Sequence, residues 1–329
     1  MEPVLKEKIW GGTRLAELLG KTAAKGRRIG ESWELADHPH GTSRVVAGPL
    51  AGRTLREVLS RHGPAILGRD LAARRWAERF GLLVKFIDAS DRLSVQVHPD
   101  DALAAAHGGG DTGKTECWVV LHAEPEAWLI RGLAPGTTRR RLREAVEAGR
   151  TEECLVRRPV QAGDFVWVPA GAVHAIGPGI VLAEVQQNSD LTYRLYDWDR
   201  PGEDGKPRPL QVREALEAID FSGDEPPSGG RGKTAEETGL HVDHLVDCPA
   251  FSLSRMRLDR RPWAGETNGA FAALIVIGGE GRVAADGESM PIAAGDTVLV
   301  PADAGEYVFE TQGTLEVLIA APPGKAPTQ

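Results

Sequence analysis

Cysteine is scarce in this chain of 329 residues, which contains only Cys117, Cys154 and Cys248. The three are widely spaced and form no CxxC pair, so we expect no disulfide framework and a reducing, cytoplasmic location. The chain also lacks any run of about 18 apolar residues, the length that a transmembrane helix needs. Its first residues, MEPVLKEKIWGG, carry charges where a secretory signal has an apolar core. The sequence therefore predicts a protein that is neither exported nor inserted in a membrane.

An excess of positive charge is absent as well. The formal net charge of −8 and the pI of about 5.7 argue against a broad nucleic-acid-binding surface. The one basic run, Arg139–Arg141, is expected to be the solvated face of a helix. What the chain does contain is glycine and proline, 39 and 22 residues, between many short Val, Ile and Leu runs. This pattern favours strands and turns over helix bundles, and it predicts a mainly β protein long enough for two domains.

Three strand-like runs bring together side chains that bind metal ions. Successive side chains of a strand point to opposite faces, so Ser94, Gln96 and His98 of SVQVHP share one face. Glu116 begins the second run, ECWVVL, and His174 ends the third, GDFVWVPAGAVH. Two imidazoles, one carboxylate and a neutral amide oxygen would suit a divalent ion such as zinc if they converge on one point.

The third run also has a recognisable spacing, with Gly163, Pro169, Gly171 and His174 in order. It resembles the second motif of the cupin superfamily, small double-sheet β-barrels that hold a metal in the barrel mouth. The order QVH, GKTECW, this motif and VQQNSDLTYRLYDWDR is more particular. Over nearly the whole chain it resembles the type I phosphomannose isomerases, in their short bacterial form.

The resemblance implies both a cofactor and a reaction. The cofactor would be one zinc ion per chain, held by Gln96, His98, Glu116 and His174. The reaction would interconvert mannose 6-phosphate and fructose 6-phosphate by proton transfer through an enediolate. A small sugar phosphate would be the partner, with no nucleic acid and no membrane.

The same resemblance implies that Lys114, Asp190 and Arg194 are catalytic, with Arg194 facing the charged part of the substrate. A phosphate dianion needs fixed cations, so we expect Arg194 to bind it with Lys85 or Lys114, and Ser94 to contact the substrate. Two alternatives remain open from the local pattern: Asp190 and Arg194 as a surface ion pair, and Lys85 as an exposed edge lysine. The base is also open between Asp190, Lys114 and a metal-bound water.

The loop GGGDTGKT, residues 108–115, matches a phosphate-binding P-loop letter for letter. That motif binds phosphate only when a strand precedes it and a helix follows, because the helix N-terminus and the loop amides hold the phosphates. Here ALAAAH before the loop is helix-prone, and ECWVVL after it is rich in β-formers. A nucleotide site is therefore not expected.

The remaining pattern predicts the domain organisation. RIGESWEL and TSRVVAGPL are expected to be strands, and helical periodicity appears at about 55–80, 137–149 and 209–220. Residues 222–239 are polar and rich in Pro and Gly. We therefore expect a metal-binding catalytic cupin domain at 1–225, a linker at 226–240 and a second cupin-like barrel at 241–329.

An internal repeat supports the second barrel. PIAAGDTVLVPADAGE, residues 291–306, aligns without gaps on PVQAGDFVWVPAGAVH, residues 159–174, with nine identities in sixteen positions. Glu306 replaces His174 in the repeat, so the second barrel is expected to lack the metal and to share an interface with the first. His241 and His244 are expected to be solvated histidines that precede the strands of the second barrel.

Two other functions would fit a cupin fold. An iron-dependent cupin dioxygenase would keep open positions on its metal for oxygen. A non-catalytic cupin would bind a sugar phosphate without turnover. The isomerase is favoured because Lys114, Asp190 and Arg194 accompany the four ligands in the order of the family.

Overall fold

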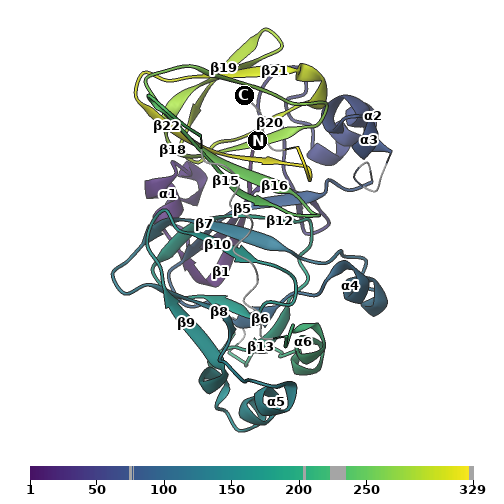
Figure 1. Ribbon diagram of the computed structural model, residues 1–329, viewed down its shortest axis with the longest axis vertical. Helices are drawn as coiled ribbons and strands as arrows, with labels where there is room; N and C mark the ends of the chain where they lie inside the picture. Colours follow the sequence, from purple (N-terminus) through teal and green to yellow (C-terminus); the bar gives the residue numbers. More distant parts are fainter. Residues whose placement is uncertain (74–75, 77, 203–204, 223–234, 326–329) are drawn as a thin grey trace.

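The computed structural model describes residues 1–73, 76, 78–202, 205–222 and 235–325. Figure 1 shows two groups of β-strands stacked along the long axis of the molecule. We call residues 1–222 the first β unit and residues 235–325 the second β unit. The mainly β fold predicted from the sequence is confirmed. Among the described residues, no helix has the length and apolar character needed to cross a membrane.

The first β unit consists of two antiparallel sheets that face each other. The six-stranded sheet has the order β1-β2-β5-β12-β7-β10, with strands β1 Val4–Gly12, β2 Ile29–Leu35, β5 Leu82–Ala89, β12 Ile180–Gln187, β7 Glu116–Ala123 and β10 Phe165–Val168. The five-stranded sheet has the order β13-β6-β11-β8-β9, with strands β13 Tyr193–Tyr196, β6 Val95–Val97, β11 His174–Ile176, β8 Trp128–Leu133 and β9 Leu155–Pro159. Aromatic and aliphatic side chains from both sheets fill the space between them, among them Trp118, Leu129 and Ile176.

The central strands β5 and β12 are buried on both faces, and their sequences explain why. LLVKFIDA and IVLAEVQQ are nearly continuous apolar runs rather than alternating ones, as expected for strands with no solvated face. They pair in register from Ile180 opposite Ala89 to Gln187 opposite Leu82. That register places Lys85 directly opposite Glu184, the only strongly charged pair in the middle of these two strands.

Short helices lie at the periphery of the first β unit. They are α1 Arg14–Leu18, α2 Leu55–Leu67, α3 Arg69–Ala72, α4 Asp101–His107, α5 Arg139–Glu147 and α6 Val212–Ala218. Helix α2 begins with a capping box in which Thr54 and Glu57 bond to each other's backbone N–H groups. Helices α2, α5 and α6 confirm the helical periodicity seen in the sequence. The strand predicted for TSRVVAGPL is wrong, because Arg44 makes only isolated bridges and residues 47–52 turn instead.

The second β unit is a single nine-stranded antiparallel sheet that curls on itself. Its strands are β14 Ala235–Glu237, β15 Leu240–Asp247, β16 Ser252–Asp259, β17 Trp263–Glu266, β18 Ala272–Ala285, β19 Glu288–Ala293, β20 Thr297–Val300, β21 Glu306–Glu310 and β22 Thr314–Ala321. A linker was expected at 226–240. Residues 226–234 lie outside the described residues, and the rest of the segment contains β14 and the first residue of β15. In the repeated segment, β20 and β21 take the places of β10 and β11.

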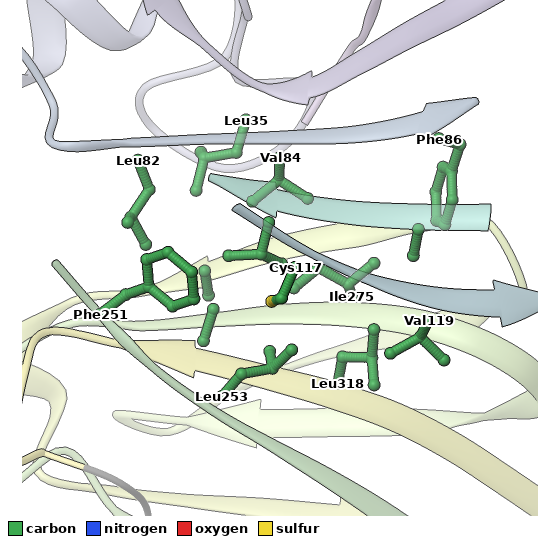
Figure 2. Packing of buried hydrophobic residues seen from close by; sticks show 14 of the residues in the cluster. Leu35, Leu82, Val84, Phe86, Cys117, Val119, Phe251, Leu253, Ile275 and Leu318 are labelled. Carbon is green, nitrogen blue, oxygen red and sulfur yellow. The ribbon is translucent and has the colours of Figure 1, made fainter. Parts of the chain in front are cut away.

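The shared interface expected between the two β units is a continuous apolar core. One face of β5, β7 and β12 contributes Val84, Cys117 and Val119, among others. The second β unit contributes Phe251, Leu253, Ile275, Leu318 and Ala320. Figure 2 shows Val84, Cys117 and Val119 meeting Phe251, Leu253, Ile275 and Leu318 between the two sets of strands. The six-stranded sheet is therefore the middle layer of the molecule, with the second β unit on one face and the polar site on the other.

Candidate active site

Three buried side chains from three strands converge at the polar end of the first β unit. His98 follows β6, Glu116 begins β7 and His174 begins β11. Their nitrogen and oxygen atoms all lie within 4.8 Å of one another, and no other such group of His, Cys, Asp or Glu occurs among the described residues. His98 Nε2 is 3.5 Å from Glu116 Oε2, and His174 Nε2 is 3.4 Å from Glu116 Oε1. The convergence predicted from strand alternation is therefore present.

Backbone carbonyls determine which nitrogen of each histidine is free. His98 Nδ1 lies 2.9 Å from Leu191 O, and His174 Nδ1 lies 2.9 Å from Ala172 O. A carbonyl oxygen can only accept, so each Nδ1 carries the proton and each Nε2 has a lone pair. Each of these two nitrogens lies within 3.5 Å of an oxygen of the Glu116 carboxylate. Such outer hydrogen bonds are those that orient histidines as metal ligands.

Gln96 adjoins the cluster, as the sequence predicts. It lies in β6 opposite His174 of β11, and its Nε2 is 3.2 Å from His174 Nε2. A half-turn of the amide about its terminal torsion places its oxygen there instead. Ser94 is buried on the same face of the chain, with Oγ 3.5 Å from Gln96 Oε1.

Lys114 is buried beside the cluster. Its Nζ is 2.6 Å from Glu116 Oε2 and 3.1 Å from His98 Nε2. The P-loop reading of the preceding glycines is excluded by the order of elements, since helix α4 comes before the loop and strand β7 after it. This lysine therefore faces the histidine and carboxylate side chains, and the loop opens no helix that could hold a nucleotide.

Burial makes the charged form of each cluster residue costly. It lowers the pKa of His98 well below the usual range and that of His174 to about 4, so both imidazoles are neutral near pH 7. Burial also raises the pKa of Glu116 to about 7, and Lys114 opposes this shift. Lys114 is the one cation that contacts this carboxylate among the described residues, at Oε2, while Oε1 has no hydrogen-bond partner there. Two neutral imidazoles and a buried carboxylate with one unpaired oxygen form an environment that a cation would stabilise.

A cavity of about 410 Å³ adjoins the cluster through Gln96 and Lys114, which line it. Its walls are mostly polar and charged. They include every catalytic and substrate-binding residue predicted from the sequence, Lys85, Ser94, Lys114, Asp190 and Arg194, and the predicted metal ligand Gln96. Trp10, Trp118, Ile87, Leu93 and Ile176 supply its apolar floor. A small, highly polar ligand fits this lining better than an apolar one.

Lys85 forms a buried ion pair in the cavity wall. It is only 4% exposed, and its Nζ is 2.9 Å from Glu184 Oε1, while Trp118 Nε1 donates to Glu184 Oε2 at 3.0 Å. The alternative of an exposed edge lysine is therefore wrong. On the same wall, Glu31 is 3.2 Å from Lys8. Burial alone would raise the pKa of Glu31, but Lys85 and Lys8 lower it to about 2.

Two arginines stand at the rim of the cavity. Arg194 Nη1 donates to Pro209 O at 2.8 Å, while its buried Nε has no hydrogen-bond partner among the described residues. Arg208 is held by Asp197, which accepts from its Nε at 2.7 Å and from its Nη2 at 2.6 Å. Burial and the neighbouring Arg208 lower the pKa of Arg194. The rim is therefore a cationic environment that an anion would stabilise.

Asp190 and Arg194 do not form the surface ion pair that was left open from the sequence. The Asp190 carboxylate faces the cavity and contacts His40, with Oδ2 2.7 Å from the Nδ1 of that histidine. Its backbone N–H donates to Asp111 Oδ2 at 3.1 Å. The two residues line the same cavity through separate contacts.

Sequence reasoning missed Glu184, Arg208 and Glu31, all of which line the cavity. A signal for Glu184 did exist, because it is a lone carboxylate inside the apolar run IVLAEV and therefore needs a buried partner. Glu31 belongs to ESWEL, which the sequence presents as an ordinary strand. Nothing in the pattern around Arg208 distinguishes it from a surface arginine.

The second β unit has no comparable cluster in its described residues. Glu306, at the position of His174, is exposed. His241 and His244 lie within β15 rather than before the strands, and both are half-buried. His241 Nε2 is 3.0 Å from Asp243, and His244 Nδ1 is 2.8 Å from Ser254 Oγ. The expectation of solvated histidines before the barrel is corrected accordingly.

Comparisons with known proteins assign the family. Residues 1–127 match the family described as "Phosphomannose isomerase type I, catalytic domain", and residues 241–320 match "Mannose-6-phosphate isomerase, cupin domain". The chain is 39% identical over 322 residues to mannose-6-phosphate isomerase ManA of Bacillus subtilis, covering 97% of each chain. It is 34% identical over 318 residues to the mannose-6-phosphate isomerase of Streptococcus mutans, covering 97% of this chain and 96% of the relative.

Solved structures agree with this assignment. The crystal structure of the mannose 6-phosphate isomerase from Bacillus subtilis has a TM-score of 0.88 at 31% identity, with 97% of each chain covered. The apo form of mannose 6-phosphate isomerase from Salmonella typhimurium shares the fold, with a TM-score of 0.73 at 16% identity and 98% of each chain covered. The cupin fold predicted from the sequence is confirmed, and the chain belongs to the type I phosphomannose isomerase family.

Proposed function

We propose that this chain interconverts mannose 6-phosphate and fructose 6-phosphate in the 410 Å³ cavity, with one zinc ion held by Gln96, His98, Glu116 and His174. Family membership supports the reaction. The observation that carries the assignment of the site is the buried cluster of two neutral imidazoles and one carboxylate, which contacts Gln96 and Lys114 in the wall of a cavity with a cationic rim.

The donor set fits zinc by charge and by ligand type. Imidazole nitrogens, a carboxylate and an amide oxygen are ligands that zinc accepts, and two neutral histidines with one carboxylate would leave the site at net +1. A residual positive charge is useful because a bound zinc supplies Lewis-acid stabilisation to the oxyanion of an enediolate. A second carboxylate among the ligands would remove that charge.

We assign binding of the phosphate to Arg194. Lys85 and Lys114 were the other candidates for binding the phosphate. The ammonium of Lys85 is engaged by Glu184 at 2.9 Å, and Lys114 contacts Glu116 of the metal-ligand cluster rather than the rim. Arg194 stands at the rim with an unsatisfied Nε and with Arg208 beside it. Lys85 would then act by keeping Glu184 ionised in the wall, and Ser94 would contact the sugar next to Gln96.

Asp190 is the residue we assign to proton transfer. Three carboxylates besides the metal ligand line the cavity: Glu31, Glu184 and Asp190. Lys85 and Lys8 lower the pKa of Glu31 to about 2, and Glu184 accepts hydrogen bonds on both oxygens from Lys85 and Trp118. Asp190 has one side-chain partner, His40, on one oxygen. The second oxygen is therefore the better proton acceptor. Lys114, beside the cluster, would stabilise negative charge on the substrate oxygens.

We further propose that residues 1–225 form the catalytic domain and that 241–329 form a barrel without chemistry, supported by the exposure of Glu306. The three cysteines are free, which supports a reducing, cytoplasmic location.

A coupled assay tests the proposed function. Purified protein should convert mannose 6-phosphate to fructose 6-phosphate, lose the activity on chelation and regain it with zinc. Oxygen consumption with iron would indicate a dioxygenase instead. Saturable binding of the sugar phosphate without turnover would indicate a non-catalytic cupin.

A further inference from the structure

The geometry points to His40 as the residue that positions Asp190 for catalysis, although His40 itself lies outside the cavity. This inference rests on the proposed function, because it gives Asp190 the proton-transfer role. The observation behind it is the contact of 2.7 Å between His40 Nδ1 and Asp190 Oδ2, made across 150 positions of sequence.

The hairpin that carries His40 is held in one conformation. It consists of β3 Asp37–His38 and β4 Gly41–Thr42. The backbone N–H of His40 donates to His38 Nδ1 at 3.1 Å, and Lys6 donates to the His40 carbonyl. The two imidazole rings pack edge to face, with centroids 4.7 Å apart. These contacts fix both the backbone and the ring of His40.

His38 ties the same hairpin to the loop before Glu116. Because His38 Nδ1 accepts from the backbone, its Nε2 carries the proton and donates to Asp111 Oδ1 at 3.1 Å. Asp111 also accepts from Arg79 at 2.8 Å and from the backbone N–H of Asp190 at 3.1 Å. Although burial alone would raise it, these hydrogen bonds lower the pKa of Asp111 to about 2, so it stays ionised. The hairpin thus holds Asp190 twice, through its backbone and through its carboxylate.

The carboxylate needs such a hold because Asp190 shares the cavity wall with cationic side chains. Lys85, Lys114 and Arg194 line the same cavity, and the charge of Asp190 acts on Lys85. Without an opposing contact, Asp190 would turn toward these cations and lose the orientation required for proton transfer. His40 supplies that contact from the outer side, where its ring is 62% exposed.

Substitutions of His40 separate positioning from packing. His40→Ala should lower kcat by about tenfold and leave KM within about twofold, because the substrate contacts remain. Asparagine places an amide nitrogen near the position of Nδ1, so His40→Asn should recover kcat to within about threefold of the wild type, whereas the longer His40→Gln should resemble alanine. His241→Ala is the matched control, since that half-buried histidine also contacts an aspartate, and it should leave both constants unchanged. Zinc content should stay at one per chain in all four variants.

A double-mutant cycle completes the test. Asp190→Ala should lower kcat by about 10²-fold or more, and adding His40→Ala to it should change kcat by less than about twofold. Unimpaired turnover in Asp190→Ala would refute the role of Asp190 in the proposed function and this inference with it. An inactive Asp190→Ala beside an unimpaired His40→Ala would refute this inference alone. So would an equal tenfold loss in both backgrounds. If His40→Ala fails to fold, equal kcat values for His40→Asn and His40→Gln would overturn the inference.

Discussion

Replacing Leu318 by alanine should destabilise the first β unit, although Leu318 belongs to the second. Leu318 lies in β22, is fully buried and packs in the shared core that Figure 2 shows between the two β units. Removing a buried leucine side chain costs about 2–5 kcal/mol, through lost burial and the cavity left behind. Leu18→Ala is the matched control, because Leu18 is 43% exposed and its truncation should change stability by less than about 0.5 kcal/mol.

The tryptophans allow the first β unit to be observed separately. The chain has eight, and Trp263 is the one in the second β unit. Its Nε1 has no hydrogen-bond partner among the described residues, so Trp263→Phe removes an unsatisfied donor, and the cost of the smaller ring cancels when Leu318→Ala is compared with its parent in the same background. In that background, fluorescence reports the first β unit only, while far-ultraviolet circular dichroism reports both.

In urea at a fixed zinc concentration, both signals should change in one transition, and Leu318→Ala should lower its midpoint for both. The expected loss of unfolding free energy is about 2 kcal/mol or more. A fluorescence midpoint that does not move, with an earlier transition seen only by circular dichroism, would refute a shared core that couples the two units.

Three further predictions follow from the site. Lys114→Ala should lower turnover while zinc stays bound. Calorimetry of the wild type with ATP should show no heat of binding, whereas micromolar affinity for ATP would support a nucleotide-binding P-loop at residues 108–115. Glu306→Gln should keep one zinc per chain and turnover within about threefold, less than 1 kcal/mol of transition-state stabilisation, and a loss by orders of magnitude would reveal a second site. The folded-state pKa of Asp111, about 2 against an ordinary 3.8, means that its charge stabilises the fold above about pH 4 and that this stabilisation is lost as the pH falls toward 2. The stability difference between wild type and Asp111→Asn in urea should shrink over that interval, and a constant difference would contradict the assignment.

The cluster of candidate metal ligands could be predicted from the sequence because it depends on the alternation and turns of short segments. Strand alternation puts Gln96 and His98 on one face, and the Pro-Ala-Gly turn stands at a recognisable spacing before His174. The repeat at 291–306 similarly disclosed the second β unit, because β20 and β21 keep the apolar positions of their counterparts. These features are set by neighbours in sequence.

The partners of the charged residues could not be predicted in the same way. Lys85 is paired with Glu184 by the register of β5 against β12, across 99 positions. His40 meets Asp190 only because a short hairpin reaches the loop after β12. The prediction of a strand at TSRVVAGPL was wrong for a related reason. Its apolar residues Val45 and Leu50 pack on the shared core from an irregular segment that pairs with no strand. Long-range register decides these contacts, and one sequence carries little information on it.

Titration of the metal-free protein with zinc tests the central claim most directly. Chelated protein should recover mannose 6-phosphate isomerase activity in proportion to the zinc added, with a sharp end point at one equivalent per chain. His98→Ala should show no such recovery at stoichiometric zinc, because the loss of one ligand from a four-ligand site removes most of its affinity. Full activity without any divalent metal, or recovery in His98→Ala that matches the wild type, would contradict a metal site at His98, Glu116 and His174.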